Sequence, residues 1–208
     1  MLKSYRRYGR QTKIFILIIA LMAGILSPCT TLRVEAAPKW KNAYKKILKN
    51  WRLAEKYDDL SYLKSYFGND YGFDIYFIYD LNKDGTPELF LHSTTMGLTE
   101  ILTFKKGKIT GLGYDHIYGI KKSKKALIIN GHWHGAGGSG KDEWTVYTIG
   151  KKKLKQKYYL DIWDGEVNVN FKKSTKSTYN KIYKEYVKGT AKFGKFKKYK
   201  LSDMKGLK

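Results

Sequence analysis

Residues 73–92 read FDIYFIYDLNKDGTPELFLH, and this stretch carries the clearest structural signal in the chain. Aromatic and β-branched residues fill its two ends, which predicts one strand over Phe73–Tyr79 and another over Leu89–Leu91. Between the strands lies a polar segment with a glycine and a proline, both of which favour turns. The stretch therefore predicts a β-hairpin whose loop, residues 80–88, is acidic.

The loop has the side-chain spacing of a calcium site. Oxygen-bearing side chains stand at its positions 1, 3, 5 and 9, and glycine stands at position 6. Calcium takes about six to eight oxygen ligands, and a loop that coils around the ion turns alternate side chains inward. The alternative is an acidic turn without an ion. On the calcium interpretation the affinity is ~10⁻⁴–10⁻³ M, as in extracellular modules, and the predicted ligands are Asp80, Asn82, Asp84, Thr86 (through its backbone carbonyl) and Glu88.

These residues resemble two known families. The first nine positions are similar to an EF-hand loop or to the shortened loop of dockerins, but position 12 is Leu91 instead of glutamate, and strands flank the loop in place of helices. The pattern D-x-[DN]-x-D-G-x-x-[DE] more closely resembles the strand–loop–strand calcium hairpin of FG-GAP repeats in integrin α chains. The chain also resembles, more loosely, exported uncharacterised proteins of Gram-positive bacteria that contain a lysine-rich helix followed by YDxNxDGxPEL. The resemblance implies a calcium-stabilised hairpin in an exported protein.

The first 36 residues have the organisation of a secretory signal peptide. A basic stretch without acids precedes the apolar run Ile14–Leu26, which is shorter than the ~20 residues of a membrane-spanning helix. Val34-Glu35-Ala36 is a small-residue cleavage site, so we expect cleavage after Ala36, a single domain over residues 37–208, and a secreted, extracellular or cell-wall location. Leu26–Cys29 resembles a lipobox with Pro28 at a position that prefers a small residue, so a lipoprotein or an N-terminally anchored form is the alternative.

The composition excludes several classes of protein. Cys29 is the single cysteine and would leave with the signal peptide, which excludes a disulfide scaffold, a cysteine zinc site and a cysteine nucleophile in the mature protein. Lysine and arginine number 41 against 18 acids, a formal charge of +23, yet Arg52 is the only arginine after residue 36. Lysine attracts anions without the planar fork that reads bases and phosphates. We therefore expect no specific nucleic-acid partner. Two explanations of the positive charge remain: a solvated lysine surface, or attraction to an anionic cell wall or membrane.

The remaining pattern predicts an α+β fold. Apolar residues recur at helical spacing over Pro38–Lys56, and a second short helix is expected from Leu60 to Phe67. Short polar turns then link one strand pattern to the next, with Asp164-Gly165 as a type I′ signal, which predicts an antiparallel β-meander of several hairpins. Near the end we expect a short C-terminal helix over residues 178–188, with Ser177 as its N-cap, and a last strand over residues 193–201. The helices, including the N-terminal amphipathic one, would cover one face of the meander.

Three further patterns suggest chemistry. His132 and His134 share one face of an extended segment and, with His116 or His92, could hold zinc with an open water position. Asp161, Asp164 and Glu166 could supply paired carboxylates for glycoside hydrolysis. The glycine-rich segment 135–141 lacks the serine or threonine of a phosphate-binding loop and is interpreted as a flexible loop or binding lid.

The sequence thus predicts an exported, non-enzymatic calcium-binding protein that binds a protein or glycan through its sheet face or its 131–140 loop. The alternative is a secreted hydrolase, either zinc-dependent or carboxylate-dependent, acting on cell-wall or glycan substrates. The sequence leaves open whether the chain is an enzyme.

Overall fold

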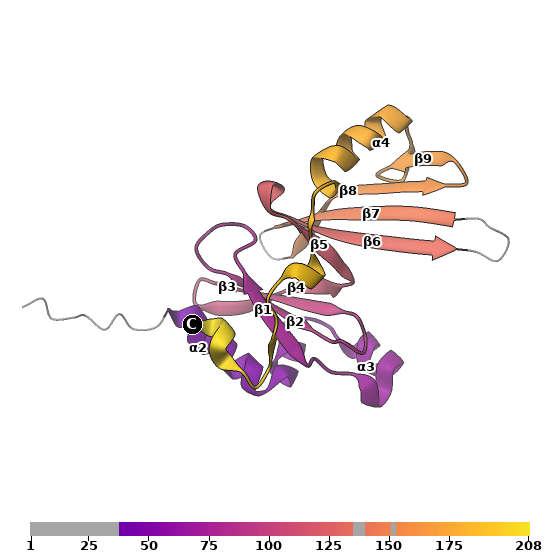
Figure 1. The fold of residues 1–208 in the computed structure, drawn as a ribbon. Helices are drawn as coiled ribbons and strands as arrows, with labels where there is room; N and C mark the ends of the chain where they lie inside the picture. The colour runs from indigo at the N-terminus through magenta and orange to yellow at the C-terminus, as the bar shows by residue number, and fades with distance from the viewer. Residues whose placement is uncertain (1–37, 135–139, 151–152) are drawn as a thin grey trace, which may run out of the picture. The chain divides into compact units, whose positions relative to one another are not determined.

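The computed structural model describes residues 38–134, 140–150 and 153–208, and their strands form two antiparallel sheets (Figure 1). Helices precede the first strand, and a short helix lies near the C-terminus, before the last strands. The predicted α+β class built from antiparallel hairpins is therefore confirmed. The predicted signal peptide, residues 1–36, lies outside the described residues, as do residues 135–139 of the glycine-rich segment.

The N-terminal helical region is divided where the sequence predicted one helix. The elements are α2 (Lys39–Lys49), the 3₁₀ turn η1 (Trp51–Lys56), α3 (Ser61–Phe67) and the 3₁₀ turn η2 (Gly68–Asp70). The first break falls at Asn50, whose φ of −148° and ψ of 89° are not helical. Helix α3 ends at Gly68, where φ is 55°, a conformation that glycine adopts without strain.

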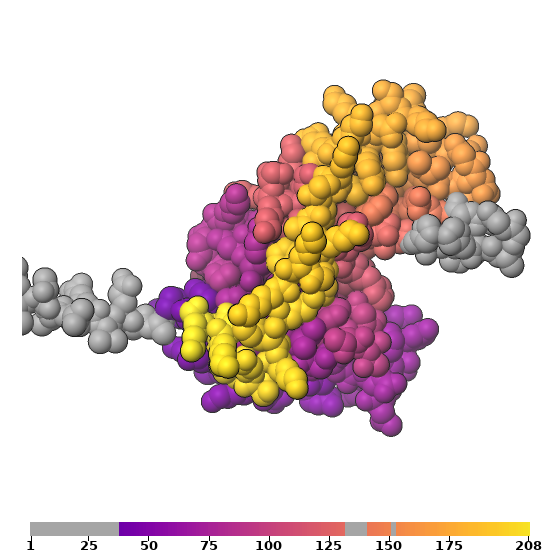
Figure 2. Space-filling view, viewed as in Figure 1, coloured from indigo at the N-terminus to yellow at the C-terminus, as the bar shows by residue number. Residues whose placement is uncertain are grey.

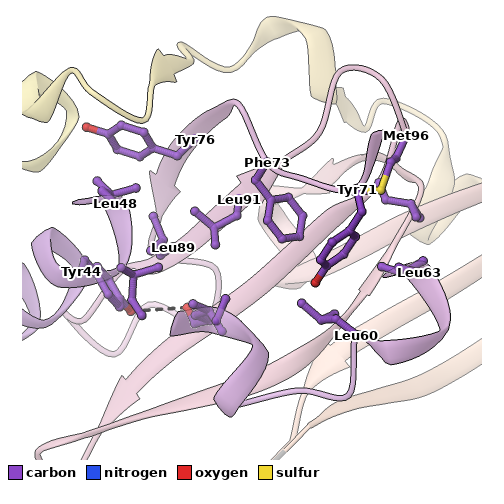
Figure 3. Packing of buried hydrophobic residues seen from close by; sticks show 14 of the residues in the cluster. Tyr44, Leu48, Leu60, Leu63, Tyr71, Phe73, Tyr76, Leu89, Leu91 and Met96 are labelled. Atoms are coloured by element: carbon purple, nitrogen blue, oxygen red, sulfur yellow. Dashed lines mark hydrogen bonds between the residues drawn. The ribbon is translucent and has the colours of Figure 1, made fainter. Parts of the chain in front are cut away.

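The first sheet carries the acidic hairpin at its centre. Its strand order is β12-β1-β2-β3-β4, and all its pairs are antiparallel. The helical region packs on one face of this sheet, with Tyr44 and Leu48 of α2 against Leu89 and Leu91 of β2 (Figure 3). The bounds are β1 (Ile75–Tyr79), β2 (Glu88–His92), β3 (Thr99–Lys105), β4 (Lys108–Asp115) and β12 (Tyr199–Lys200).

The second sheet has the order β10-β9-β8-β7-β6-β5-β11. Asp164 and Gly165 connect β8 to β9 with φ values of 48° and 84°, as the predicted type I′ turn requires. The strands are β5 (Ile117–Lys121), which the 3₁₀ turn η3 (Lys122–Lys124) connects to β6 (Ala126–His134), then β7 (Gly140–Ile149), β8 (Leu154–Trp163), β9 (Glu166–Val169), β10 (Lys172–Lys173) and β11 (Ala191–Lys192).

The C-terminal helix begins two residues earlier than predicted. Helix α4 (Lys176–Ile182) continues into a π-helical turn, η4 (Tyr183–Val187), and packs on one face of the second sheet. The N-cap is Thr175, whose side chain accepts a hydrogen bond from Thr178 N, so the prediction of Ser177 was wrong. Threonine and serine both cap helices, and the sequence offered both within three residues.

One apolar cluster draws on both sheets. Phe77, Phe90 and Ile101 of the first sheet pack with Ile120 and Leu127 of the second, and all five side chains are buried. The segment after η4 contributes a strand to each sheet: β11 pairs with β5, and β12 pairs with β1. Figure 2 shows this C-terminal segment in yellow, running from the orange residues to the indigo residues of the N-terminal region. The sequence predicted one continuous strand over 193–201, but the 3₁₀ turn η5 (Phe193–Lys195) interrupts it, and η6 (Met204–Leu207) follows β12.

No helix in the described part of the chain is both long and apolar enough to span a membrane.

Candidate functional site

The acidic loop closes the hairpin between β1 and β2. Tyr79 and Glu88 are register partners at the base of the loop, so residues 80–87 form the whole connection. Lys83 and Gly85 have φ values of 58° and 86°, which coil the backbone instead of extending it. Glycine adopts this conformation freely, which is why the sequence needs it at position 6 of the loop.

The side chains at positions 1, 3 and 5 turn back onto the loop backbone. The Asp80 carboxylate accepts hydrogen bonds from Asp84 N (3.1 Å) and Gly85 N (3.0 Å). Asn82 Oδ1 accepts from Asp84 N (2.8 Å), and Asp84 Oδ1 accepts from Thr86 N (2.9 Å). The alternation that the sequence predicted is therefore present in the loop, with every second side chain on its inner side.

Glu88 lies at the base of the loop and is fully buried. Its Oε2 accepts a hydrogen bond from Leu81 N (2.8 Å), and its Oε1 lies 3.3 Å from Thr103 Oγ1 of β3. Burial is the main reason that the pKa of Glu88 rises to about 7, and the negative charges of Asp84 and Asp80 raise it further. Among the described residues, no lysine or arginine forms an ion pair with these three acids.

Two carboxylates of the loop converge on one hydrogen-bond donor. Asn82 Nδ2 lies 2.9 Å from Asp84 Oδ2 and 3.4 Å from Glu88 Oε1. An amide nitrogen thus occupies the position between two acids that a cation would favour. In the described ranges, however, no group of three or more histidine, cysteine, aspartate or glutamate side chains could by itself hold a metal ion. The predicted ligand set therefore depends on Asn82 and on the carbonyl of Thr86 as well as on the acids.

The described histidines have separate partners. His92 Nδ1 lies 2.9 Å from Thr99 Oγ1, and His116 Nδ1 lies 3.1 Å from the carbonyl oxygen of Gly97. His132 and His134 belong to β6, where they are register partners of Asp142 and Gly140, but their side chains lie outside the described part. The zinc site predicted from His132, His134 and His116 thus gains no support from the described side chains.

Each of the three carboxylates considered for hydrolysis has a structural role in the second sheet. Asp161 is 7% exposed and accepts a hydrogen bond from Asn168 Nδ2 (2.8 Å). Asp164 forms the β8–β9 turn, and the exposed Glu166 lies 3.5 Å from Lys173 Nζ. Each therefore has a local role in the β8–β9–β10 region that needs no substrate.

One half-buried polar cluster on the second sheet was not predicted. Lys141 Nζ lies 2.8 Å from both Glu143 Oε2 and Tyr159 Oη, and Tyr159 donates to the same Glu143 oxygen (2.9 Å). Phe171, 70% exposed, stacks on Tyr159 with ring centroids 4.2 Å apart. Its φ of 64° is uncommon for an aromatic residue. The sequence indicated this cluster only through the two-residue spacing of Lys141 and Glu143, which places both side chains on one face of a strand.

A basic cavity of about 540 Å³ lies between α2 and the β3–β4 turn. Its apolar wall includes Ile47, Leu53 and Phe104. Lysines contribute its charged lining, and no acid lines it: the lysines are Lys39, Lys46 and Lys108. The cavity therefore favours negatively charged groups.

Comparison with known proteins matched this chain to no family model, no curated protein and no solved structure, so its function has to be inferred from its own residues.

Proposed function

We propose that this protein is an exported, non-enzymatic binding protein in which Ca²⁺, held by the 80–88 loop, stabilises the β1–β2 hairpin. The observation that carries the proposal is the convergence of Asp84 and Glu88 on the single donor atom Asn82 Nδ2. An amide group carries no net charge and offsets only part of the repulsion between two carboxylates, whereas a divalent cation at this position would offset it fully.

The donor atoms favour calcium over other metals. Asp80, Asn82, Asp84 and Glu88 offer oxygen, the ligand that hard cations prefer, and the loop contains no histidine or cysteine. An oxygen that already accepts one backbone N–H retains a second lone pair, so the Asp80 carboxylate can coordinate while it holds the loop. Asn82 would present Oδ1 to the ion, and Thr86 its carbonyl.

The bound ion would act as a structural link between strands. Asp80 follows the end of β1, Glu88 begins β2, and Thr103 of β3 contacts Glu88 Oε1. Neutralising Glu88 would therefore stabilise the centre of the first sheet as well as the loop. Nothing in this role requires a reaction, which is why we favour a binding protein over an enzyme.

We propose an anionic partner at a cell wall or membrane surface. The lysines Lys39, Lys46 and Lys108 around the basic cavity support this choice, because they attract negative charge next to an apolar wall. The exposed aromatic residues Trp163 and Phe171 on the second sheet are a second surface on which a protein or glycan could pack.

Thermal unfolding of the full chain with CaCl₂ or with a chelator tests the calcium proposal. At about 10 mM Ca²⁺ we expect Tm to rise by about 3 to 10 °C, the range set by the expected affinity and the chain length. Asp84→Asn keeps the shape of the side chain but removes its charge and should abolish most of the rise. The exposed Asp70 lies outside the loop, so Asp70→Asn should leave the rise intact.

An unchanged Tm in wild type, or an equal rise in Asp84→Asn, would refute the calcium site. Metal analysis of the purified chain addresses the hydrolase alternative. Stoichiometric zinc that is lost in His132→Ala would replace our proposal with a zinc enzyme.

A further inference from the structure

Four buried side-chain oxygens lack a hydrogen-bond partner among the described residues, and they belong to only three side chains. They are Glu55 Oε1, Tyr71 Oη and both carboxyl oxygens of Glu100. Glu100 is fully buried and Tyr71 is 6% exposed. Folded proteins rarely leave such groups unpaired, because an unpartnered buried polar group costs free energy. Their occurrence in one region indicates that this region is built for a ligand.

The first sheet and the helical region enclose these groups together. Glu100 of β3 is the register partner of Leu91 and of Tyr114, and Leu91 packs under the helices, so the Glu100 side chain lies on that same face. Tyr71 follows η2, and its ring lies edge-on to Trp51 at 5.3 Å. Figure 3 shows the Tyr71 hydroxyl directed towards Leu60, between the strands and the helices.

A cavity of about 240 Å³ reaches this region from the surface. Glu55 and Tyr71, two of the residues with unpartnered oxygens, line it together with Asp59, Leu60, Ser61 and Lys64. The Asp59 carboxylate accepts hydrogen bonds from Ser61 N (3.0 Å) and Ser61 Oγ (2.6 Å), which fixes one side of the opening. The lining therefore presents acceptor oxygens together with one apolar side chain, Leu60, and one lysine, Lys64.

We propose that this cavity binds a small primary ammonium ion, with Glu55 and Tyr71 as its direct partners and Glu100 behind them. An ammonium group has three donors and no acceptor, which complements a wall of unpartnered oxygens. The Tyr71 ring and Leu60 would contact the carbon chain of the ligand. A metal ion fits less well, because among the described residues only two carboxylates, those of Glu55 and Asp59, line the cavity.

The charges around the cavity favour a cation. Negative charge comes from Glu55, Asp58 and Asp59, and positive charge from Arg52, which lies 3.6 Å from Glu55 Oε1, and from Lys64 on the lining. Burial raises the pKa of Glu100 to about 9, and the charge of Asp58 contributes to the rise. Burial also raises the pKa of Tyr71, and the charges of Glu55 and Glu100 add to it. Glu100 is therefore protonated at neutral pH, and an arriving cation would displace its proton.

Isothermal titration of the full chain with n-butylammonium chloride tests the proposal. At pH 8 we expect saturable binding, with a heat that depends on the ionisation enthalpy of the buffer because Glu100 releases a proton. Glu100→Gln and Tyr71→Phe should each weaken binding about tenfold or more. Glu100→Gln cannot take up the negative charge that Glu100 gains on binding, and Tyr71→Phe loses a hydrogen bond to a charged group. Lys64→Met, which removes a repelling charge at the opening, should tighten binding.

The controls separate this site from general attraction to acids. Tetramethylammonium carries the same charge but has no N–H donor, so it should bind at least about tenfold more weakly. Circular dichroism should show that Glu100→Gln and Tyr71→Phe remain folded, since glutamine keeps the shape of a Glu100 side chain that is neutral before the ligand binds. No saturable heat in wild type, or equal affinity in wild type and both variants, would overturn the proposal. The calcium loop shares no residue with this cavity, so either proposal can fail alone.

Discussion

Glu88 and Glu100 are two fully buried carboxyl groups on neighbouring strands, and their surroundings differ. Glu88 accepts hydrogen bonds from the loop and from β3, whereas both oxygens of Glu100 are unpartnered among the described residues. The sequence identified Glu88 because it completes a spaced pattern with Asp80 and Asp84. It did not identify Glu100, because an acid within a strand pattern is equally consistent with an exposed position.

Replacing Glu88 by glutamine should raise the stability of the calcium-free protein and remove the rise in Tm that calcium causes. In chelator at neutral pH, Glu88→Gln should be more stable than wild type by about 1 to 3 kcal/mol, since a buried charge close to Asp80 and Asp84 is removed. In calcium the variant should show no further rise in Tm. Calorimetry in both buffers measures this, with the exposed Glu166→Gln as control. A variant less stable than wild type in chelator would show that the Glu88 charge is itself stabilising.

Glu100 should give the stability of the protein a distinctive pH dependence. Its pKa is about 9 in the folded chain against an ordinary value of 4.5, so the folded state retains a proton that the unfolded state loses between these values. Stability should therefore fall as pH rises from 4.5 to 9. Glu100→Gln lacks this contribution, so its advantage over wild type should grow across that range. Urea unfolding at several pH values measures it, and a constant difference would contradict the assignment.

At the scale of elements, turn chemistry made the hairpins predictable. Asp164-Gly165 specifies a tight turn by its own conformational preference, and Gly68 ends α3 for the same reason. The break at Asn50 was not predictable, because the apolar spacing continues from α2 into η1 and only packing separates the two. Tyr44 shows such a tertiary contact: its hydroxyl donates to the carbonyl oxygen of Pro87 (2.9 Å), which connects α2 to the 80–88 loop.

The contact between β4 and the segment after η1 depends on the absence of a side chain at residue 111. A Cβ on Gly111 would lie 2.5 Å from the carbonyl oxygen of Tyr57, a backbone atom that cannot rotate away. Gly111→Ala should therefore destabilise the protein by about 1 to 3 kcal/mol. A Cβ on Gly194 would meet nothing within 4 Å, so Gly194→Ala should change stability by less than about 0.5 kcal/mol. Equal Tm values for the two variants would show that the segment at Tyr57 moves freely.

At the scale of the molecule, the division into two sheets was not predictable. A two-residue apolar period shows which face of a strand is buried, but it does not show which distant strands pair. The pairing of Tyr199 with Tyr76 and of Ala191 with Ile120 joins residues far apart in sequence. The candidate metal loop was predictable because its ligands are local. The ammonium cavity was not, because Glu55, Tyr71 and Glu100 come from separate elements.

The shared apolar cluster should make the two sheets unfold together. Leu127 of the second sheet is fully buried in this cluster with Phe90 of the first. Leu127→Ala should lower the stability of the whole domain by about 2 to 5 kcal/mol. Circular dichroism and tryptophan fluorescence should still report one common transition, as a single cooperative unit requires. Two separated transitions would show that the sheets are independent.

The most direct test of the calcium site is a titration of the ¹⁵N-labelled full chain with CaCl₂, followed by NMR at the backbone amide of Gly85. This amide donates to Asp80 within the loop, so coordination by Asp80 must change its environment. We predict a saturable shift with a dissociation constant of ~10⁻⁴–10⁻³ M, shared by the neighbouring loop amides and absent in Asp84→Asn. A Gly85 resonance that does not move at about 10 mM CaCl₂, well above that range, would contradict the site.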